Sequence, residues 1–264
     1  MAHKSIDGIV VRMSDYGATD RYLSVLTASE GRFTLLAKGS RSMKSEQLPV
    51  SQMFTYCNYE YYTKGDLNIL KGGSVIKSFY DIGKDVGAMA LGCYLCDLAC
   101  ELSDEGEDAE ELLRLLLNSL YALVEKRFPR DVIKAAFEFR AAAISGYAPT
   151  LDTCERCGSL REEMYLDVQG GVLICPACLK NSARHPQREE EGGATPLCLV
   201  SEAVLTALRY CMQAPVSRVF SFQLKEAADR EAFARLCETY VLSHLERGFS
   251  TLDFYRTIAD TPGL

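Results

Sequence analysis

The chain has few of the residues on which catalytic sites are commonly built. It contains three histidines, His3, His185 and His244, too few and too scattered to predict a catalytic pair. No Ser/His/Asp arrangement stands out, and neither G-x-x-x-x-G-K-[ST] nor G-x-G-x-x-G occurs, so no loop that cradles nucleotide phosphates is predicted. These absences give no reason to expect an enzyme.

Long apolar segments are missing as well. No apolar run approaches the roughly 18 residues of a membrane-spanning helix. The N-terminal segment MAHKSIDGIVVRMSDYG lacks the apolar stretch of a signal peptide. The eleven cysteines are an odd number, and without a signal we expect them to be reduced thiols in the cytosol rather than disulfides.

The chain as a whole lacks the positive charge that is typical of a nucleic-acid-binding protein, since its formal net charge is −7. The charge is unevenly distributed. Residues 1–80 carry ten Lys/Arg against seven Asp/Glu, a net +3, and the remainder carries nineteen against twenty-nine, a net −10. Because salt screens charges farther apart than about 8–10 Å, a locally basic face can still bind a polyanion.

The predicted fold class is α+β. Residues 1–80 read as five short strands, with hairpin turns at 29–31 and 64–66, and suit a small closed barrel of the OB or SH3-like type. From about residue 84 the apolar spacing becomes helical. We expect a barrel at 1–80, a helical bundle domain at 81–149 and 181–264, and a hairpin at 150–180 inserted in it.

Helix boundaries in the second part follow from turn and capping residues. The acidic stretch 103–111 predicts a loop and a helix start, and Pro129 and Gly146 bracket the next helix. Ser201 and Asp229 are predicted N-caps, with Gly248 just past the last of these helices. Residues 180–196 are predicted to form a surface loop.

Four cysteines carry the strongest signal, as two C-x-x-C pairs with seventeen residues between them. This spacing is typical of a structural zinc site in which all four ligands are thiolates and none is water. Between the pairs, Gly170-Gly171 predicts a hairpin turn that brings them together. The predicted ligands of one structural Zn²⁺ are Cys154, Cys157, Cys175 and Cys178, with free or redox-active thiols as the alternative.

A second cysteine group lies on a predicted helix. Cys93, Cys96 and Cys100 are spaced i, i+3 and i+7, which places them on one face. A metal or iron–sulfur interpretation lacks a fourth ligand nearby. We therefore interpret these cysteines as small apolar side chains packed in the bundle.

A basic loop is the candidate nucleic-acid contact. No acidic residue occurs from 31 to 45, and Gly39 and several serines leave the backbone able to follow phosphates. The alternative is a set of solvated lysines with no ligand. The candidate DNA-binding residues are Arg32, Lys38, Arg41 and Lys44. Tyrosines at 56, 59, 61 and 62 offer rings for base stacking, although strand alternation must place some of them in the core.

The chain resembles the RecO family of bacterial recombination mediators. The barrel segment GIVVRMSDYGATDRYLSVLTASEGRFTLLAKGSRSMKS carries one part of the likeness. The more specific part is FEFRAAAISGYAPTLDTCERCG followed by GGVLICPAC, which joins F-E-x-R, G-Y-x-P and both C-x-x-C pairs in order. The resemblance extends over nearly the whole chain.

The resemblance implies an OB-fold barrel, a helical domain and a zinc-binding insertion. It implies a cytoplasmic, nucleoid-associated DNA repair protein that binds single- and double-stranded DNA and anneals complementary strands without ATP. Its implied partners are RecR and the C-terminal tail of the single-stranded DNA-binding protein, in the loading of RecA.

A binding site for that acidic tail is the least specific prediction. Arg127, Arg130 and Lys134 cluster in the sequence beside an apolar helix and are predicted to rim the pocket. Two other classes of function remain open: a zinc-stabilised protein–protein adaptor that binds no DNA, and a redox or metal-dependent enzyme that uses the cysteines.

Overall fold

In the computed structural model, described residues are 4–182, 196–259 and 261. Most of the predicted loop 180–196 lies outside them, as do His3 and His185. The chain divides into two compact units, one formed by residues 1–130 and 249–264 and the other by 131–248. Among the described residues, no helix is both long and apolar enough to cross a membrane.

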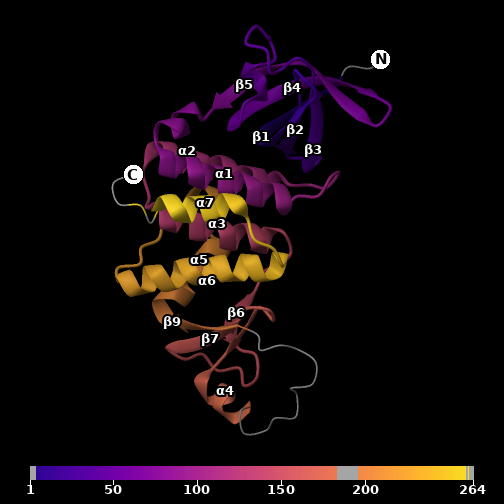
Figure 1. Ribbon diagram of the computed structural model, residues 1–264. Helices are drawn as coiled ribbons and strands as arrows, with labels where there is room; N and C mark the ends of the chain where they lie inside the picture. Colours follow the sequence, from indigo (N-terminus) through magenta and orange to yellow (C-terminus); the bar gives the residue numbers. More distant parts are fainter. Residues whose placement is uncertain (1–3, 183–195, 260, 262–264) are drawn as a thin grey trace. The chain divides into compact units, whose positions relative to one another are not determined.

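The first unit begins with a closed five-stranded barrel (Figure 1). Its strands follow the order β1-β2-β3-β5-β4 around the barrel, and all neighbours are antiparallel except β3 and β5. The strands are β1 (Lys4–Tyr16), β2 (Asp20–Thr27), β3 (Arg32–Ala37), β4 (Thr55–Lys64) and β5 (Leu67–Ser78). The order and closure confirm the predicted OB-type barrel and exclude the SH3-like alternative.

The barrel core follows the two-residue alternation of its strands. Leu35 and Ala37 of β3 point inward and meet Tyr59 and Tyr61 of β4. The short 3₁₀ helix η1 (Pro49–Ser51) packs beside them, and the Tyr59 hydroxyl donates to the Val50 carbonyl at 3.1 Å. Burial of an apolar interior on all five strands makes the barrel a stable platform for its surface loops.

Helices complete the first unit. A 3₁₀ turn, η2 (Tyr80–Lys84), leads into α1 (Val86–Glu101), whose first turn is capped by Asp85, and α2 (Glu110–Glu125) follows an acidic loop. The C-terminal helix α7 (Ser250–Ala259) packs on α1, where Phe249 lies edge-on to Tyr94 at a centroid distance of 5.7 Å. Gly248 was predicted to lie just past the preceding helix, but the helix α7 that follows it was not predicted.

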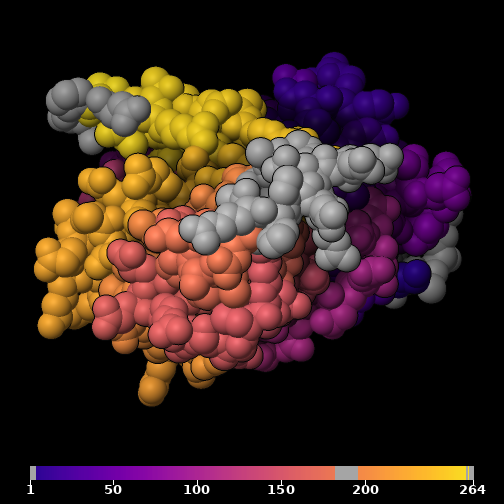
Figure 2. All heavy atoms as spheres, turned by 90° about the horizontal axis from the view of Figure 1, so that it is seen from below, coloured from indigo at the N-terminus to yellow at the C-terminus, as the bar shows by residue number. Residues whose placement is uncertain are grey.

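The second unit combines helices with a small sheet. Its helices are α3 (Arg130–Ile144), α4 (Pro176–Ser182), α5 (Glu202–Gln213) and α6 (Ala227–Leu245), and η3 (Val216–Arg218) is a 3₁₀ turn. The sheet has the order β6-β8-β7-β9, formed by β6 (Thr150–Cys154), β7 (Glu163–Asp167), β8 (Val172–Ile174) and β9 (Leu197–Ser201). Figure 2 shows residues 150–182 in pink beside α5 and α6 in orange.

Two details of this unit differ from the sequence-based expectation. Strand β9 was not predicted, and it extends the hairpin by pairing antiparallel with β7. Ser201 caps α5 as expected, but Asp229 lies in the first turn of α6 rather than at its N-cap, where it accepts a hydrogen bond from the Ser201 hydroxyl at 2.7 Å. A carboxylate in the first turn still favours the helix dipole, so the sequence signal placed the helix start within a few residues.

Candidate metal centre and nucleic-acid interface

The four cysteines predicted as ligands come together in the second unit. Cys154 and Cys157 flank the turn after β6, and Cys175 and Cys178 lie at the start of α4, directly after β8. Their four Sγ atoms all lie within 4.8 Å of one another. Among the described residues no other group of three or more such side chains is arranged to hold a metal ion.

Backbone N–H groups are aimed at the sulfurs. The amide of Cys175 donates to Sγ of Cys154 at 3.3 Å, and the amide of Cys178 donates to Sγ of Cys175 at 3.5 Å. Burial opposes ionisation of Cys154, but the backbone donors lower the pKa of its thiol. Hydrogen bonds from Ser159, whose hydroxyl lies 3.0 Å from Sγ of Cys157, and from the neighbouring cysteines lower the pKa of the Cys157 thiol to about 6.

The remaining thiol shows why the cluster suits a cation. Hydrogen bonds to Cys157 and Cys175 raise the pKa of Cys178 to about 12, because sulfurs this close favour a shared proton over a further negative charge. A divalent metal ion removes that conflict, since a coordinated thiol is deprotonated outright. The donor set and its compact geometry therefore fit a four-thiolate metal ion that has no open coordination position.

The helix-to-hairpin motif is explained by packing. Glu138 and Arg140 of F-E-x-R both belong to α3. Glu138 is buried and pairs with Lys134, and Arg140 donates a hydrogen bond to the Cys211 carbonyl. Gly146 has φ of +94°, which ends α3, and the Tyr240 hydroxyl donates to the Tyr147 carbonyl at 2.9 Å. The motif thus fixes the direction in which the chain leaves α3 toward the cysteines.

The second cysteine group has no metal-binding arrangement. Cys96 and Cys100 are buried in α1 and Cys93 is half-buried. Burial raises the pKa of all three thiols, as expected for side chains that pack as apolar residues.

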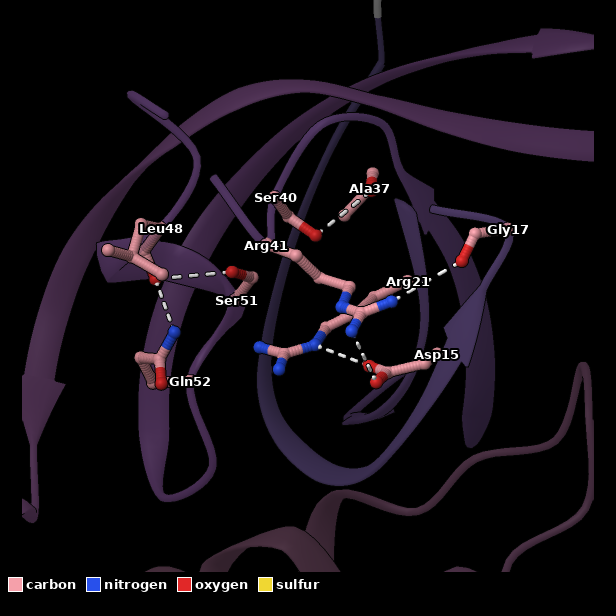
Figure 3. Close-up of polar contacts among 9 residues, drawn as sticks. All are labelled: Asp15, Gly17, Arg21, Ala37, Ser40, Arg41, Leu48, Ser51 and Gln52. Atoms are coloured by element: carbon pink, nitrogen blue, oxygen red, sulfur yellow. Dashed lines mark hydrogen bonds and ion pairs between the residues drawn. The ribbon is translucent and has the colours of Figure 1, made fainter. Parts of the chain in front are cut away.

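The basic loop after β3 is fastened to the turn between β1 and β2 (Figure 3). Arg41 Nη2 lies 3.3 Å from a carboxylate oxygen of Asp15, and its Nη1 donates to the Gly17 carbonyl at 3.3 Å. The other oxygen of Asp15 accepts from Nε of Arg21 at 2.9 Å. This hydrogen bond is the main reason why the pKa of Asp15 lies below its ordinary value.

A second carboxylate holds the start of the same loop. Asp20 accepts from the Gly39 amide at 2.8 Å, and the Arg41 amide donates to the Thr19 carbonyl at 3.0 Å. Gly39 has φ of +65°, a conformation that favours glycine. The loop is therefore anchored at 39 and 41, while Lys38 and Lys44 remain exposed on either side.

Residues near this loop that sequence reasoning missed come from other strands. Asp15 and Arg21 are distant from Arg41 in the sequence. The β1–β2 pairing places Asp15 opposite Arg21, and the β2–β3 pairing places Arg21 opposite Ala37, where the loop begins. Met43, between Arg41 and Lys44, is 88% exposed and presents an apolar side chain to solvent.

Arg32 is not brought together with the other three predicted DNA-binding residues. It begins β3, whereas Lys38 follows the end of that strand, about 20 Å away at the usual rise of a strand. Its guanidinium donates to the Cys100 carbonyl at 3.3 Å.

The tyrosines of β4 are divided between two faces, as the alternation required. Tyr59 and Tyr61 are buried in the barrel core, and Tyr56 and Tyr62 on the outer face are half-buried. Any stacking of bases on this strand is therefore restricted to Tyr56 and Tyr62.

The three residues predicted to rim a tail-binding pocket occupy different environments. Arg127 lies over the ring of Tyr121, and Arg130 binds the Asp85 carboxylate. The side chain of Lys134 is only 7% exposed and lies 2.8 Å from Glu138 and 2.6 Å from Glu238. Burial alone would lower the pKa of Lys134, but these two carboxylates raise it.

The closed barrel, the helices and the four-cysteine hairpin define an OB-barrel protein with a candidate metal centre. Family models agree with this description: "Recombination protein O N terminal" matches residues 1–79 and "Recombination protein O C terminal" matches residues 83–253. The chain belongs to the RecO family of DNA repair proteins.

Individual relatives extend the match over nearly the full length. The chain is 30% identical over 260 residues to the DNA repair protein RecO of Acetivibrio thermocellus, covering 98% of both chains. It is 27% identical over 263 residues to that of Symbiobacterium thermophilum, again covering 98% of both. The corresponding protein of an Exiguobacterium species is 31% identical over 228 residues, which is 85% of this chain and 88% of the relative.

Proposed function

We propose that this protein is a DNA-binding recombination mediator whose barrel holds DNA phosphates on the loop that follows β3. The observation that carries the proposal is the anchored loop itself, which presents Lys38 and Lys44 to solvent around the tethered Arg41. A fixed backbone loses little conformational entropy when the cations bind phosphate. We leave Arg32 out of this phosphate path because it lies at the other end of β3.

Strand annealing needs no catalytic group. It needs neutralisation of two polyanionic strands and contacts that keep bases exposed. The loop cations supply the first, and Met43 with the half-buried Tyr56 and Tyr62 offers apolar surface for the second. On this basis we propose annealing without ATP, assistance by RecR, and loading of RecA onto single-stranded DNA, in a role that is not enzymatic.

We further propose that the metal in the hairpin is one structural Zn²⁺. Four thiolates in a compact cluster suit zinc, and a site without an open position has no place for a catalytic water. The metal would hold the turn after β6 and the start of α4 together, which a small sheet cannot do with its own core alone.

The tail of the single-stranded DNA-binding protein remains a proposed partner. Arg127, which is exposed, and Arg130 beside Asp85 are the cations that support a site for an acidic peptide in the first unit. Lys134 supports it least, because its ammonium group is buried between two carboxylates.

Fluorescence anisotropy with a labelled 30-nucleotide strand tests the DNA proposal. Three phosphate contacts predict that log K falls with log salt with a slope of about −2, since each contact on a single strand contributes about −0.7. Absence of binding at low salt would instead favour the adaptor function, in which the hairpin serves protein contacts alone.

A further inference from the structure

A groove runs along β3 in the first unit, from Arg32 at the start of the strand to Leu36 near its end. Its cavity of about 250 Å³ is lined by β3, by Tyr22 of β2, and by the turn between β4 and β5. Glu30, Glu105 and Gly106 form its other end. We call this the acidic groove, because its lining includes the carboxylates of Glu30, Asp66 and Glu105.

The groove exists because the loop between α1 and α2 covers only the start of β3, and β5 pairs only with its end. At the start of β3, the Arg32 amide donates to the Asp104 carbonyl at 3.2 Å in a short bridge with the loop between α1 and α2. At its end, Leu36 pairs with Ile69 of β5. Between them lies Thr34, which is exposed and lines the cavity.

Thr34 presents backbone hydrogen-bonding groups to this gap. The amide and carbonyl groups of a strand alternate sides with a period of two, so those of Thr34 point the same way as the Arg32 amide, away from β2. Within the described part of the chain, β3 pairs with β5 only at Leu36, so no strand covers Thr34 on that side. The gap is a short open sheet edge, which is a template for an added strand.

The wall of the groove is preformed. Gly31 has φ of +53°, and a Cβ there would collide with the Asp104 carbonyl. Two more backbone hydrogen bonds hold the acidic loop to the β2–β3 turn, from Gly106 to Glu30 at 3.0 Å and from Ala109 to Ala28 at 2.8 Å. The loop therefore occupies a fixed position beside β3.

Charge decides what the groove accepts. Three carboxylates and one cation line it, and that cation, Arg32, already donates to the Cys100 carbonyl. The adjoining loop adds further exposed carboxylates at Asp104, Glu107 and Asp108. Such a surface repels phosphate and attracts ammonium and guanidinium groups. Tyr22 and Phe33 supply ring surface against which the aliphatic stem of a lysine can pack.

We propose that the acidic groove binds an extended basic segment of a partner protein, which adds a short strand to β3 at Thr34. A free polyamine would satisfy the carboxylates but not Thr34, whose amide needs an acceptor and whose carbonyl needs a donor. A peptide backbone offers both, with alternate side chains directed to the groove. This site does not depend on DNA binding by the basic loop.

The test uses the full chain and the peptide KTKVKT, acetylated and amidated at its ends. On ¹H–¹⁵N spectra we expect the peptide to shift the Thr34 amide and to slow its hydrogen exchange. The charge-neutral variant Glu30→Gln/Asp66→Asn/Glu105→Gln should bind about tenfold more weakly, because each exposed ion pair contributes a factor of about two to three. The matched control Glu46→Gln/Glu60→Gln/Glu125→Gln removes three exposed carboxylates that do not line the groove and should bind as the unaltered chain does.

The strand addition has its own test in Thr34→Pro. This variant removes the amide that faces the groove without removing a donor to β2. It should abolish the peptide-induced changes while the spectrum of the barrel core stays unchanged; if the barrel is disturbed, Thr34→N-methyl-threonine introduced by ligation replaces it. The proposal would be overturned by equal weakening in the control triple variant, by a Thr34 amide already protected in the free protein, or by a DNA strand shifting the same amides.

Discussion

The cysteine cluster and the basic loop hold their functional atoms in opposite ways. The four sulfurs lie within 4.8 Å of one another, close enough for all four to bind one metal ion. The loop cations are spread over residues 38–44, and only Arg41 is tethered by a carboxylate. A cluster of the first kind acts as a unit, so the loss of one member disables it. Cations of the second kind act nearly additively, so each contributes a fraction of the affinity.

The largest expected effect is on the cluster. Cys175→Ser removes one of the four sulfurs but keeps the backbone amide that donates to Sγ of Cys154. The variant should therefore lose stoichiometric metal binding through the missing sulfur alone. Elemental analysis should give one zinc per unaltered chain and none in the variant. Because structural zinc contributes folding free energy directly, hydrogen exchange should accelerate across residues 150–178.

Cys198→Ser is the matched control, since Cys198 is half-buried in the same sheet but lies outside the cluster. It should retain one zinc and the original exchange pattern. Metal kept by a chain that lacks both C-x-x-C pairs would contradict the assignment of the ligands.

Two lysines, the buried Lys134 and the exposed Lys126, allow the same comparison between a buried and an exposed charge. Lys134→Ala leaves Glu138, which is 0% exposed, without its neighbouring ammonium group, and breaking a buried ion pair in this way costs about 3–5 kcal/mol. Urea denaturation measures the loss. Lys126→Ala removes an exposed lysine paired with Asp85 and should cost less than about 1 kcal/mol. Equal effects of the two substitutions would show that Lys134 is not buried as described.

Charge reversal on the basic loop should have an intermediate effect. Lys38→Glu with Arg41→Glu removes two phosphate contacts, so the salt slope for single-stranded DNA should become shallower by about 1.4 and low-salt affinity should fall more than tenfold. Lys64→Glu with Lys71→Glu makes the same change in net charge at exposed barrel positions outside the loop. If both pairs weaken binding alike, net charge rather than the loop governs affinity.

The difference between the two regions also explains what the sequence could predict. The cluster depends on two short C-x-x-C turns and a Gly-Gly hairpin, all within 25 residues (154–178), so local spacing was sufficient to predict which four thiols come together. The barrel was predictable because each strand and turn carries its own alternation and turn residues. The tether of Arg41 was not, because Asp15 reaches it only through strand pairing.

The positions of Arg32 and β9 also depend on the arrangement of strands and could not be predicted from local sequence. Arg32 belongs to the basic segment in sequence, but the extended β3 carries it to the opposite end of the strand, among carboxylates. Strand β9 has a short apolar stretch whose pairing with β7 joins residues at least thirty positions apart in the sequence. Local pattern does not encode such distant pairing.

The smallest expected effect concerns Asp15, which pairs with Arg21 and Arg41. Its hydrogen bond from Arg21 lowers its pKa below the ordinary value of 3.8, so the carboxylate stays ionised in any assay near neutral pH and the tether is lost only in acid. Asp15→Asn should release Arg41 and tighten single-stranded DNA binding about two- to threefold, while the salt slope stays near about −2 because Arg41 is already one of the three phosphate contacts.

Two comparisons separate release of Arg41 from a simple change of charge. Asp7→Asn changes net charge equally on the same strand but removes a carboxylate bound by Asn58, so it should leave affinity nearly unchanged. In the double variant Asp15→Asn/Arg41→Ala the gain should vanish, because the substitution at 15 acts through Arg41. Weaker binding by Asp15→Asn alone would mean that the tether positions Arg41 for phosphate rather than withholding it. In that case the loop would act as a unit, as the cysteine cluster does.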